Sequence, residues 1–118
     1  QSVVTKAVGE CDALYIPTDN TIANNTEIVK NVAVPAGIPV VTGEEGMCSG
    51  CGLATLSISY YDLGVKAAEM AYEILTNGAD PAQMAIGYVT DGITEKYNAD
   101  IAEALNITIP EDMVAIEN

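Results

Sequence analysis

The chain has 118 residues and a formal charge of −13, from 17 acidic residues against four basic ones, all of them lysines. Because it contains neither histidine nor arginine, the composition excludes histidine-based catalysis, imidazole metal ligands and a bidentate clamp for phosphate or carboxylate. So acidic a chain also disfavours nucleic acid and anionic membrane surfaces as partners. With 49% hydrophobic and 18% charged residues, it is expected to fold as one acidic globular domain.

The apolar residues predict strands and helices that alternate along the chain. Continuous apolar runs that end at a proline or glycine are typical of buried parallel strands, and apolar residues at spacings of three and four are typical of helices. The expected helices cover residues 2–8, 20–35, 62–76 and 94–105. The expected strands cover residues 13–16, 38–41, 53–59 and, at a sheet edge, 84–90. This order predicts an α/β fold, a three-layer parallel sheet with helical crossovers, in which the glycine-rich stretch 43–52 is a loop.

Polar residues follow the first expected strand directly. Ligands of open α/β sheets bind at the carboxyl ends of the strands, where helix N-termini offer unpaired N–H groups. Thr18, Asp19 and Asn20 would project there and are candidate ligand-binding residues. The alternative is that Asp19 or Asn20 only caps the next helix, a commoner role that contributes about 1 kcal/mol.

Two adjacent carboxylates, Glu44 and Glu45, follow the second expected strand and stand between glycines. They could accept hydrogen bonds from an ammonium or hydroxyl group of a ligand, or they could form a solvated turn. General acid–base catalysis needs a second, tuned group in a cleft, and the sequence offers none, so no catalytic residue is expected. At the third junction of strand and helix, Tyr60 or Tyr61 could stack on a ligand or pack as a partly buried residue.

Cys48 and Cys51 form a CxxC motif, which raises thiol-redox chemistry as an alternative function. Redox cysteines of this kind lie at a helix N-terminus after a strand, whereas here Gly50 and Gly52 surround the motif and a strand follows. A structural zinc site would need four ligands, and only Cys11 remains, so no metal or other cofactor is expected. We therefore expect a thiol pair in a turn or a small disulfide loop, with Cys11 as a buried apolar residue.

Three segments, in their order and spacing, resemble the substrate-binding proteins of ABC transporters, in the family some of whose members bind tryptophan, tyrosine or phenylalanine. They are residues 12–21 (DALYIPTDNT), 38–47 (IPVVTGEEGM) and 53–64 (LATLSISYYDLG), and residues 109–112 (IPED) fit the C-terminal end of that family. The resemblance implies part of a type I periplasmic-binding-protein fold, which is Rossmann-like, with two doubly wound lobes that close on a ligand. It would assign residues 1–58 to the second lobe and residues 59–118 to a return into the first lobe and a C-terminal segment.

The resemblance also implies a function: a non-catalytic solute-binding component of an ABC importer, whose ligand is an amino acid or a similar small molecule. The implied partner is an ABC permease, and the implied location is extracytoplasmic, as a membrane-anchored lipoprotein or a periplasmic protein. A carboxylate at Asp19 or Glu44 could pair the ammonium group of an amino acid. The candidate ligand-binding residues on this basis are Thr18, Asp19, Asn20, Glu44, Glu45, Ser59 and Tyr60.

Further alternatives and one structural expectation accompany this interpretation. A generic flavodoxin-like or receiver-like domain would use Asp12 or Asp19 as a phospho-acceptor. A receiver-like domain also needs an acidic cluster after an earlier strand and a lysine after a later one, and this sequence has neither. The chain begins inside an expected helix, with no strand before it, which predicts a C-terminal fragment of a longer protein. Because such a fragment leaves strand edges unpaired, we expect it to pack as a single compact α/β unit or to complete its sheet by homodimerisation or swapping.

Overall fold

The computed structural model of the chain describes residues 1–117. They divide into two compact units. Unit 1 comprises residues 1–57 and the segment that begins at Thr94, and unit 2 comprises residues 58–93. The chain thus crosses between the units twice, after Ser57 and before Thr94. The assignment of these parts to two lobes stays a prediction, as does a homodimer.

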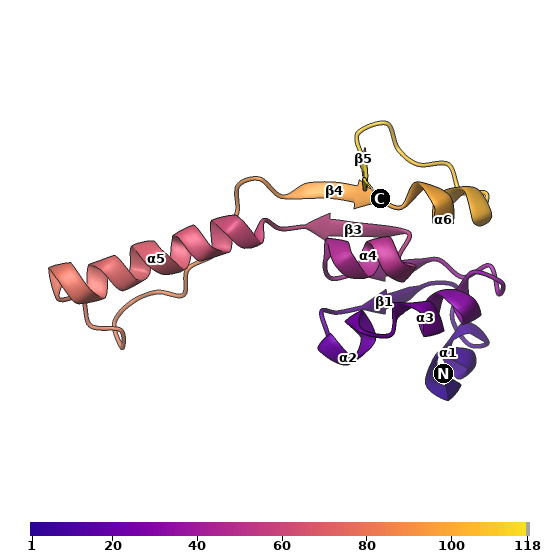
Figure 1. The fold of residues 1–118 in the computed structure, drawn as a ribbon, viewed down its shortest axis with the longest axis horizontal. Helices are drawn as coiled ribbons and strands as arrows, with labels where there is room; N and C mark the ends of the chain where they lie inside the picture. Colours follow the sequence, from indigo (N-terminus) through magenta and orange to yellow (C-terminus); the bar gives the residue numbers. More distant parts are fainter. Residues whose placement is uncertain (118) are drawn as a thin grey trace. The chain divides into compact units, whose positions relative to one another are not determined.

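Unit 1 is built on a five-stranded sheet with the strand order β1-β2-β3-β4-β5 (Figure 1). The strands are β1 (Leu14–Ile16), β2 (Val40–Thr42), β3 (Ala54–Ser57), β4 (Thr94–Tyr97) and β5 (Val114–Ala115). β1, β2 and β3 are parallel, β4 runs antiparallel to β3, and β5 is parallel to β4. The α/β class and the first three expected strands, parallel to one another, are therefore confirmed, although one face of each stays exposed; the antiparallel β4 is a feature that the sequence did not predict.

Five helices belong to unit 1: α1 (Ser2–Val8), α2 (Asn20–Ala23), α3 (Thr26–Ala33), α4 (Glu45–Cys51) and α6 (Ala99–Ala104). One face of the sheet packs against α3 and α4 in a core made of Ile16, Val29, Ala33, Val40, Met47 and Cys51. A second cluster of Leu53, Ile101 and Ala102 joins α6 to the sheet. Because strand side chains alternate between faces, Tyr15, Val41 and Leu56 lie on the opposite face and are exposed.

The expected helix over residues 20–35 forms as two shorter helices, α2 and α3, separated at Asn25. The Asn25 side chain donates a hydrogen bond to the Thr21 carbonyl at 2.7 Å, and asparagine side chains of this kind compete with the helical backbone. α3 ends before Pro35, because the proline has no N–H group with which to extend the helix.

The glycine-rich stretch over residues 43–52, which is expected as a loop, forms α4 instead. The Glu44 carboxylate caps its first turn, and a Cβ at Gly50 would lie 2.4 Å from the hydroxyl oxygen of Thr26 at the start of α3. Because Gly50 lacks a side chain, α4 can pack directly against α3. Tertiary packing here overrides the low helix propensity of glycine.

The C-terminal helix expected over residues 94–105 is shorter, because its first residues form β4. They pair with β3 from Thr94, opposite Ser57, to Tyr97, opposite Ala54. Asn98 then caps α6: its side-chain oxygen accepts a hydrogen bond from the Ile101 N–H at 3.2 Å. Sheet pairing with a distant strand therefore replaces the first turn of the expected helix.

Unit 2 consists of α5 (Tyr60–Asn77) and the segment that follows it. Ser59 caps α5, three residues before Asp62, where the helix is expected to begin, and Gly78 ends it with a left-handed φ of 68°. The expected edge strand over residues 84–90 is wrong: these residues pair with no strand of the described chain, and instead residues 84–88 line an open groove of about 730 Å³ with one side of α5. All 18 residues of α5 are at least partly exposed.

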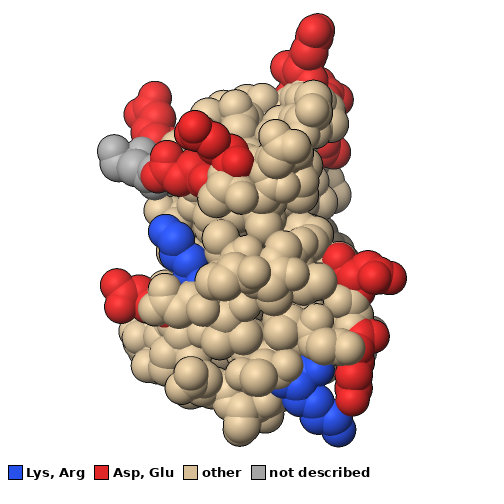
Figure 2. All heavy atoms as spheres, turned by 90° about the vertical axis from the view of Figure 1, so that its right-hand side faces the viewer, with Lys and Arg blue, Asp and Glu red and all other residues tan. Residues whose placement is uncertain are grey.

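On the face of unit 1 that carries α1 and α6, charged side chains stand apart rather than in one patch. Figure 2 shows the end of unit 1 that carries α1 and α6, where Asp and Glu side chains stand in small groups around a largely uncharged face. Within residues 1–117, none of the helices combines the length and the apolar character that crossing a membrane requires.

Candidate functional site

The loops that follow β1 and β2 lie against each other at the carboxyl edge of the parallel strands. The Gly43 N–H donates a hydrogen bond to the Ile16 carbonyl at 2.9 Å. A Cβ at Gly43 would lie 2.7 Å from the backbone nitrogen of Thr18 and 2.9 Å from its hydroxyl oxygen, so this approach needs a glycine. The fold therefore brings residues 18–20 beside residues 43–45, as the parallel order of the expected strands predicts.

Asp19 is the N-cap of α2, and its neighbours Thr18 and Asn20 are exposed. The Asp19 Oδ1 accepts a hydrogen bond from the Ile22 N–H at 2.9 Å. The capping role left open by the sequence is thus present. The cap occupies only one carboxylate oxygen, and the exposed side chain can still accept a hydrogen bond at Oδ2.

Glu44 is the N-cap of α4 and uses both carboxylate oxygens. Oε2 accepts a hydrogen bond from the Gly46 N–H at 2.8 Å, and Oε1 accepts one from the Met47 N–H. The Glu44 carbonyl also accepts a hydrogen bond from the Thr42 hydroxyl at 3.1 Å. This carboxylate is therefore committed to the start of its own helix.

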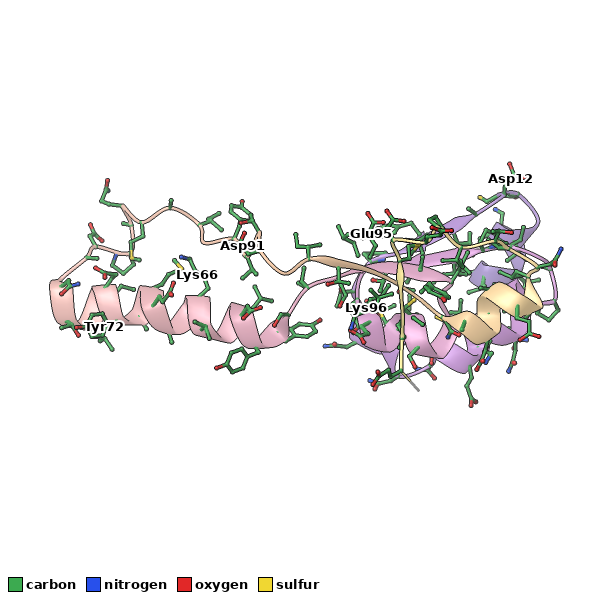
Figure 3. All side chains as sticks on the ribbon, turned by 90° about the horizontal axis from the view of Figure 1, so that it is seen from above. Asp12, Lys66, Tyr72, Asp91, Glu95 and Lys96 are labelled. Atoms are coloured by element: carbon green, nitrogen blue, oxygen red, sulfur yellow. The ribbon has the colours of Figure 1, made fainter. Side chains whose placement is uncertain are left out.

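Glu45, the first residue of α4, is paired with a lysine. Its Oε2 accepts a hydrogen bond from the Lys96 Nζ at 2.8 Å and another from the Ser57 hydroxyl at 3.0 Å. The Lys96 hydrogen bond holds the pKa of Glu45 below its ordinary value; partial burial opposes this shift, and the Ser57 hydrogen bond adds to it. Figure 3 shows Lys96 on the α4 side of β4 and Glu95 on the other side, as strand alternation requires.

Neither Ser57 nor Lys96 is a candidate site residue from the sequence. Lys96 lies 51 residues from Glu45 and is expected in a helix, so only the antiparallel return of β4 brings the two together. Ser57 could have been found by its alternation with Thr55 along β3, which gives one face of that strand hydroxyl groups.

Ser59 and Tyr60 belong to unit 2. The Ser59 hydroxyl caps α5 by accepting a hydrogen bond from the Asp62 N–H at 3.1 Å. Tyr60 opens that helix and is 61% exposed. Their contact with a ligand stays a prediction.

The cysteines contradict most of what the sequence predicts for them. Cys48 lies at the middle of α4 and Cys51 is its last residue, so neither is in a turn, and they are free thiols at 0% and 1% exposure. Burial raises the pKa of each thiol to about 11, although a hydrogen bond with Thr42 partly offsets this for Cys48. Cys11 is exposed rather than buried, because it lies in the turn between α1 and β1.

Thiols that are buried and resist ionisation are poor nucleophiles, so these cysteines do not favour the redox alternative. A helix lowers a thiol pKa at its N-terminus, whereas Cys48 lies at the middle of α4 and Cys51 at its last residue. Among residues 1–117, no group of three or more cysteine, aspartate or glutamate side chains is placed to hold a metal ion.

Comparison with known proteins identifies relatives across nearly the whole chain. The family model of ABC transporter substrate-binding proteins matches residues 1–117. Tyrosine-binding protein of Clostridioides difficile (strain R20291) is 44% identical over 72 residues, which are 61% of this chain and 21% of that protein. The chain therefore spans only about a fifth of this relative.

Two solved structures share the fold. One is the ligand-free, open structure of a substrate-binding protein with adhesive properties from Clostridium difficile, with 35% identity and a TM-score of 0.73 over 98% of this chain. The other is an ABC domain in complex with L-Trp from Streptococcus pneumonia, with 31% identity and a TM-score of 0.80 over 97% of this chain. Each match covers 39% of the other protein. The matched family model and the shared fold agree with the motifs at residues 12–21, 38–47 and 53–64, and the chain belongs to the family of ABC transporter substrate-binding proteins.

Proposed function

We propose that this chain forms one side of the ligand-binding cleft of an amino-acid-binding protein that serves an ABC importer and has no catalytic activity. The observation that carries the proposal is the contact of the two loops at the carboxyl edge of β1 and β2, which gathers exposed polar side chains from residues 18–20. Two relatives support an amino-acid ligand: one is named a tyrosine-binding protein, and the other was solved with L-Trp.

Among the three carboxylates at this edge, Asp19 is the best partner for the ammonium group of an amino acid. Glu44 has both oxygens on backbone N–H groups of α4, and Glu45 is paired with Lys96. Asp19 is exposed and uses one oxygen in its cap, so Oδ2 can accept a charged hydrogen bond. The hydroxyl of Thr18 and the amide of Asn20 can donate to the ligand carboxylate in place of an arginine.

The finer proposal is an aromatic amino acid. Tyr60 presents an exposed ring at the start of α5, and an exposed tyrosine can stack on an aromatic ligand while its hydroxyl stays solvated. Ser59 would add a hydroxyl group beside it. The importer role further implies an ABC permease as partner and an extracytoplasmic location, as a lipoprotein or a periplasmic protein.

The test is titration calorimetry of the whole protein that carries this chain, against the twenty amino acids. Asp19→Ser retains an oxygen that can cap α2 but removes the charge, so the helix is kept while the ammonium contact is lost. We expect affinity to fall by about tenfold or more, the value of a charged hydrogen bond. Asp12→Ser, which changes an exposed aspartate before the opposite end of β1, is the matched control and should bind as the wild type does. Absence of binding to any amino acid, or an unchanged affinity of Asp19→Ser, contradicts the proposal.

A further inference from the structure

The two places where the chain crosses between the units are neighbours in the sheet of unit 1. The chain leaves after Ser57 at the end of β3 and returns at Thr94 at the start of β4, and these two residues are register partners. Lys96 follows two residues into β4, opposite Thr55. The strands that carry both crossings therefore run side by side next to α4.

Glu45 contacts both of these strands through a single oxygen. Its Oε2 accepts from the Ser57 hydroxyl of β3 at 3.0 Å and from the Lys96 Nζ of β4 at 2.8 Å. Glu45 also follows Glu44 directly, so its backbone continues from the loop that touches Thr18. The residue thus connects the candidate ligand loop to the ends of two strands.

This ion pair differs from the other salt bridges of the described chain. Lys6–Glu10 at 4.0 Å and Lys66–Glu69 at 3.2 Å each lie within a few residues of sequence, and at least 44% of every side chain in them is exposed. Lys96 and Glu45 are 27% and 39% exposed and are 51 residues apart. Such a pair can fix the relative position of two elements, which a pair of sequence neighbours cannot do.

Two buried hydroxyl groups, those of Thr42 and Thr55, also hold the loop over residues 43–44 through hydrogen bonds. The Thr55 hydroxyl of β3 donates to the Thr42 carbonyl of β2 at 2.8 Å, and the Thr42 hydroxyl donates to the Glu44 carbonyl at 3.1 Å. The loop is thereby held by hydrogen bonds on both sides, and only the Glu45 side reaches β4.

We propose that Glu45 is a positioning residue, which holds the Gly43–Glu44 loop against β3 and β4 and so sets the geometry of the ligand site without touching the ligand. This inference rests on the proposed function, because it concerns the same site. Without the pair, the start of α4 loses its connection to β4, and the loop samples positions that do not match the ligand.

The test is a double-mutant cycle in the whole protein, with Glu45→Gln, Lys96→Met and the double variant, and with the amino acid that the wild type binds as the probe. We expect each single change to weaken affinity about twofold to fivefold, the range of a partly exposed ion pair. The affinity of the double variant should be no lower than that of the single variant with the lower affinity, because both changes remove the same ion pair. Glu10→Gln removes the same charge from an exposed pair of unit 1 and should leave affinity unchanged.

A second readout separates positioning from stability alone. Hydrogen exchange at the Gly46 and Met47 amides, measured without ligand and well below the melting temperature, should accelerate in Glu45→Gln and stay unchanged in Glu10→Gln. If the wild type binds an amino acid and Glu45→Gln binds it with the same affinity, the inference is overturned and the proposed function stands. Additive effects in the cycle, or a loss above a hundredfold in Glu45→Gln alone, overturn it too, because they indicate separate roles or direct ligand contact. A wild type that binds no amino acid overturns the proposed function and this inference with it.

Discussion

Asn98 joins two helices of unit 1, and its removal gives a sharp test of how the unit is held together. Its side chain is 3% exposed. The amide nitrogen donates to the carbonyls of Ser49 at 2.8 Å and Cys48 at 3.2 Å, in α4, and the amide oxygen caps α6 through the Ile101 N–H at 3.2 Å. One side chain thus satisfies groups at the end of α4 and at the start of α6.

Asn98→Ala should lower the free energy of unfolding by about 2–3 kcal/mol. Loss of the cap contributes about 1 kcal/mol. Loss of the hydrogen bond that Asn98 donates to the Ser49 carbonyl contributes about 1 kcal/mol more. The Cys48 carbonyl still accepts a hydrogen bond from the Gly52 N–H at 3.0 Å, so its loss contributes less.

The assay is urea unfolding followed by circular dichroism, in which a loss of this size shifts the midpoint by about 1 M or more. Asn98→Asp separates the two roles, since an aspartate still caps α6 but cannot donate to α4. Asn25→Ala is the matched control: it removes one exposed hydrogen bond and should cost about 0.5 kcal/mol or less. If Asn98→Ala costs no more than this control, the junction of α4 and α6 does not depend on Asn98, and the reasoning is refuted.

Two further predictions concern ionisable groups. With thiol pKa values of about 11, Cys48 and Cys51 should be about one part in a thousand ionised at pH 8. A thiol reagent should therefore modify the exposed Cys11 quickly and the other two cysteines only after unfolding. Rapid reaction of all three cysteines in the native protein would contradict the burial of Cys48 and Cys51. Because the Lys96 hydrogen bond lowers the pKa of Glu45 in the folded state, the stability it contributes is present above the ordinary value of 4.5 and is lost as the pH falls through the lowered value. The contribution should stay below about 1 kcal/mol, since the pair is partly exposed, and Glu45→Gln should remove this part of the pH dependence measured by thermal unfolding; an identical pH dependence in the variant would refute it.

The parts of the fold that could be predicted are those with local causes. The strands that became β1 and β2 are short apolar runs that end at Pro17 and Gly43, and these signals need no knowledge of the rest of the chain. β4 could not be predicted in this way, because its residues form a strand only through pairing with β3. α4 is similar: the stretch is rich in glycine, yet Gly50 is the position at which α4 must come close to Thr26.

The candidate site likewise has features that local signals predict and features that depend on contacts between distant residues. The place of residues 18–20 and 43–45 beside one another follows from the parallel order of the strands, so it could be predicted before any contact was known. The partners of the individual carboxylates could not. Whether a glutamate caps its own helix, as Glu44 does, or pairs with Lys96, as Glu45 does, depends on backbone angles and on a strand that returns 51 residues later.

These partners change what the composition says about the ligand. Lys96 is the lysine that the described contacts place at the carboxyl edge, and Glu45 already neutralises it. Asp19 and Glu44 remain at the edge as carboxylates, in a chain of net charge −13 without arginine. A ligand that carried only negative charge would meet repulsion here and no cation to offset it, whereas an ammonium group would be attracted. The electrostatics of this edge therefore favour a ligand group that carries positive charge, which is the charge of the ammonium group in the proposed amino-acid ligand.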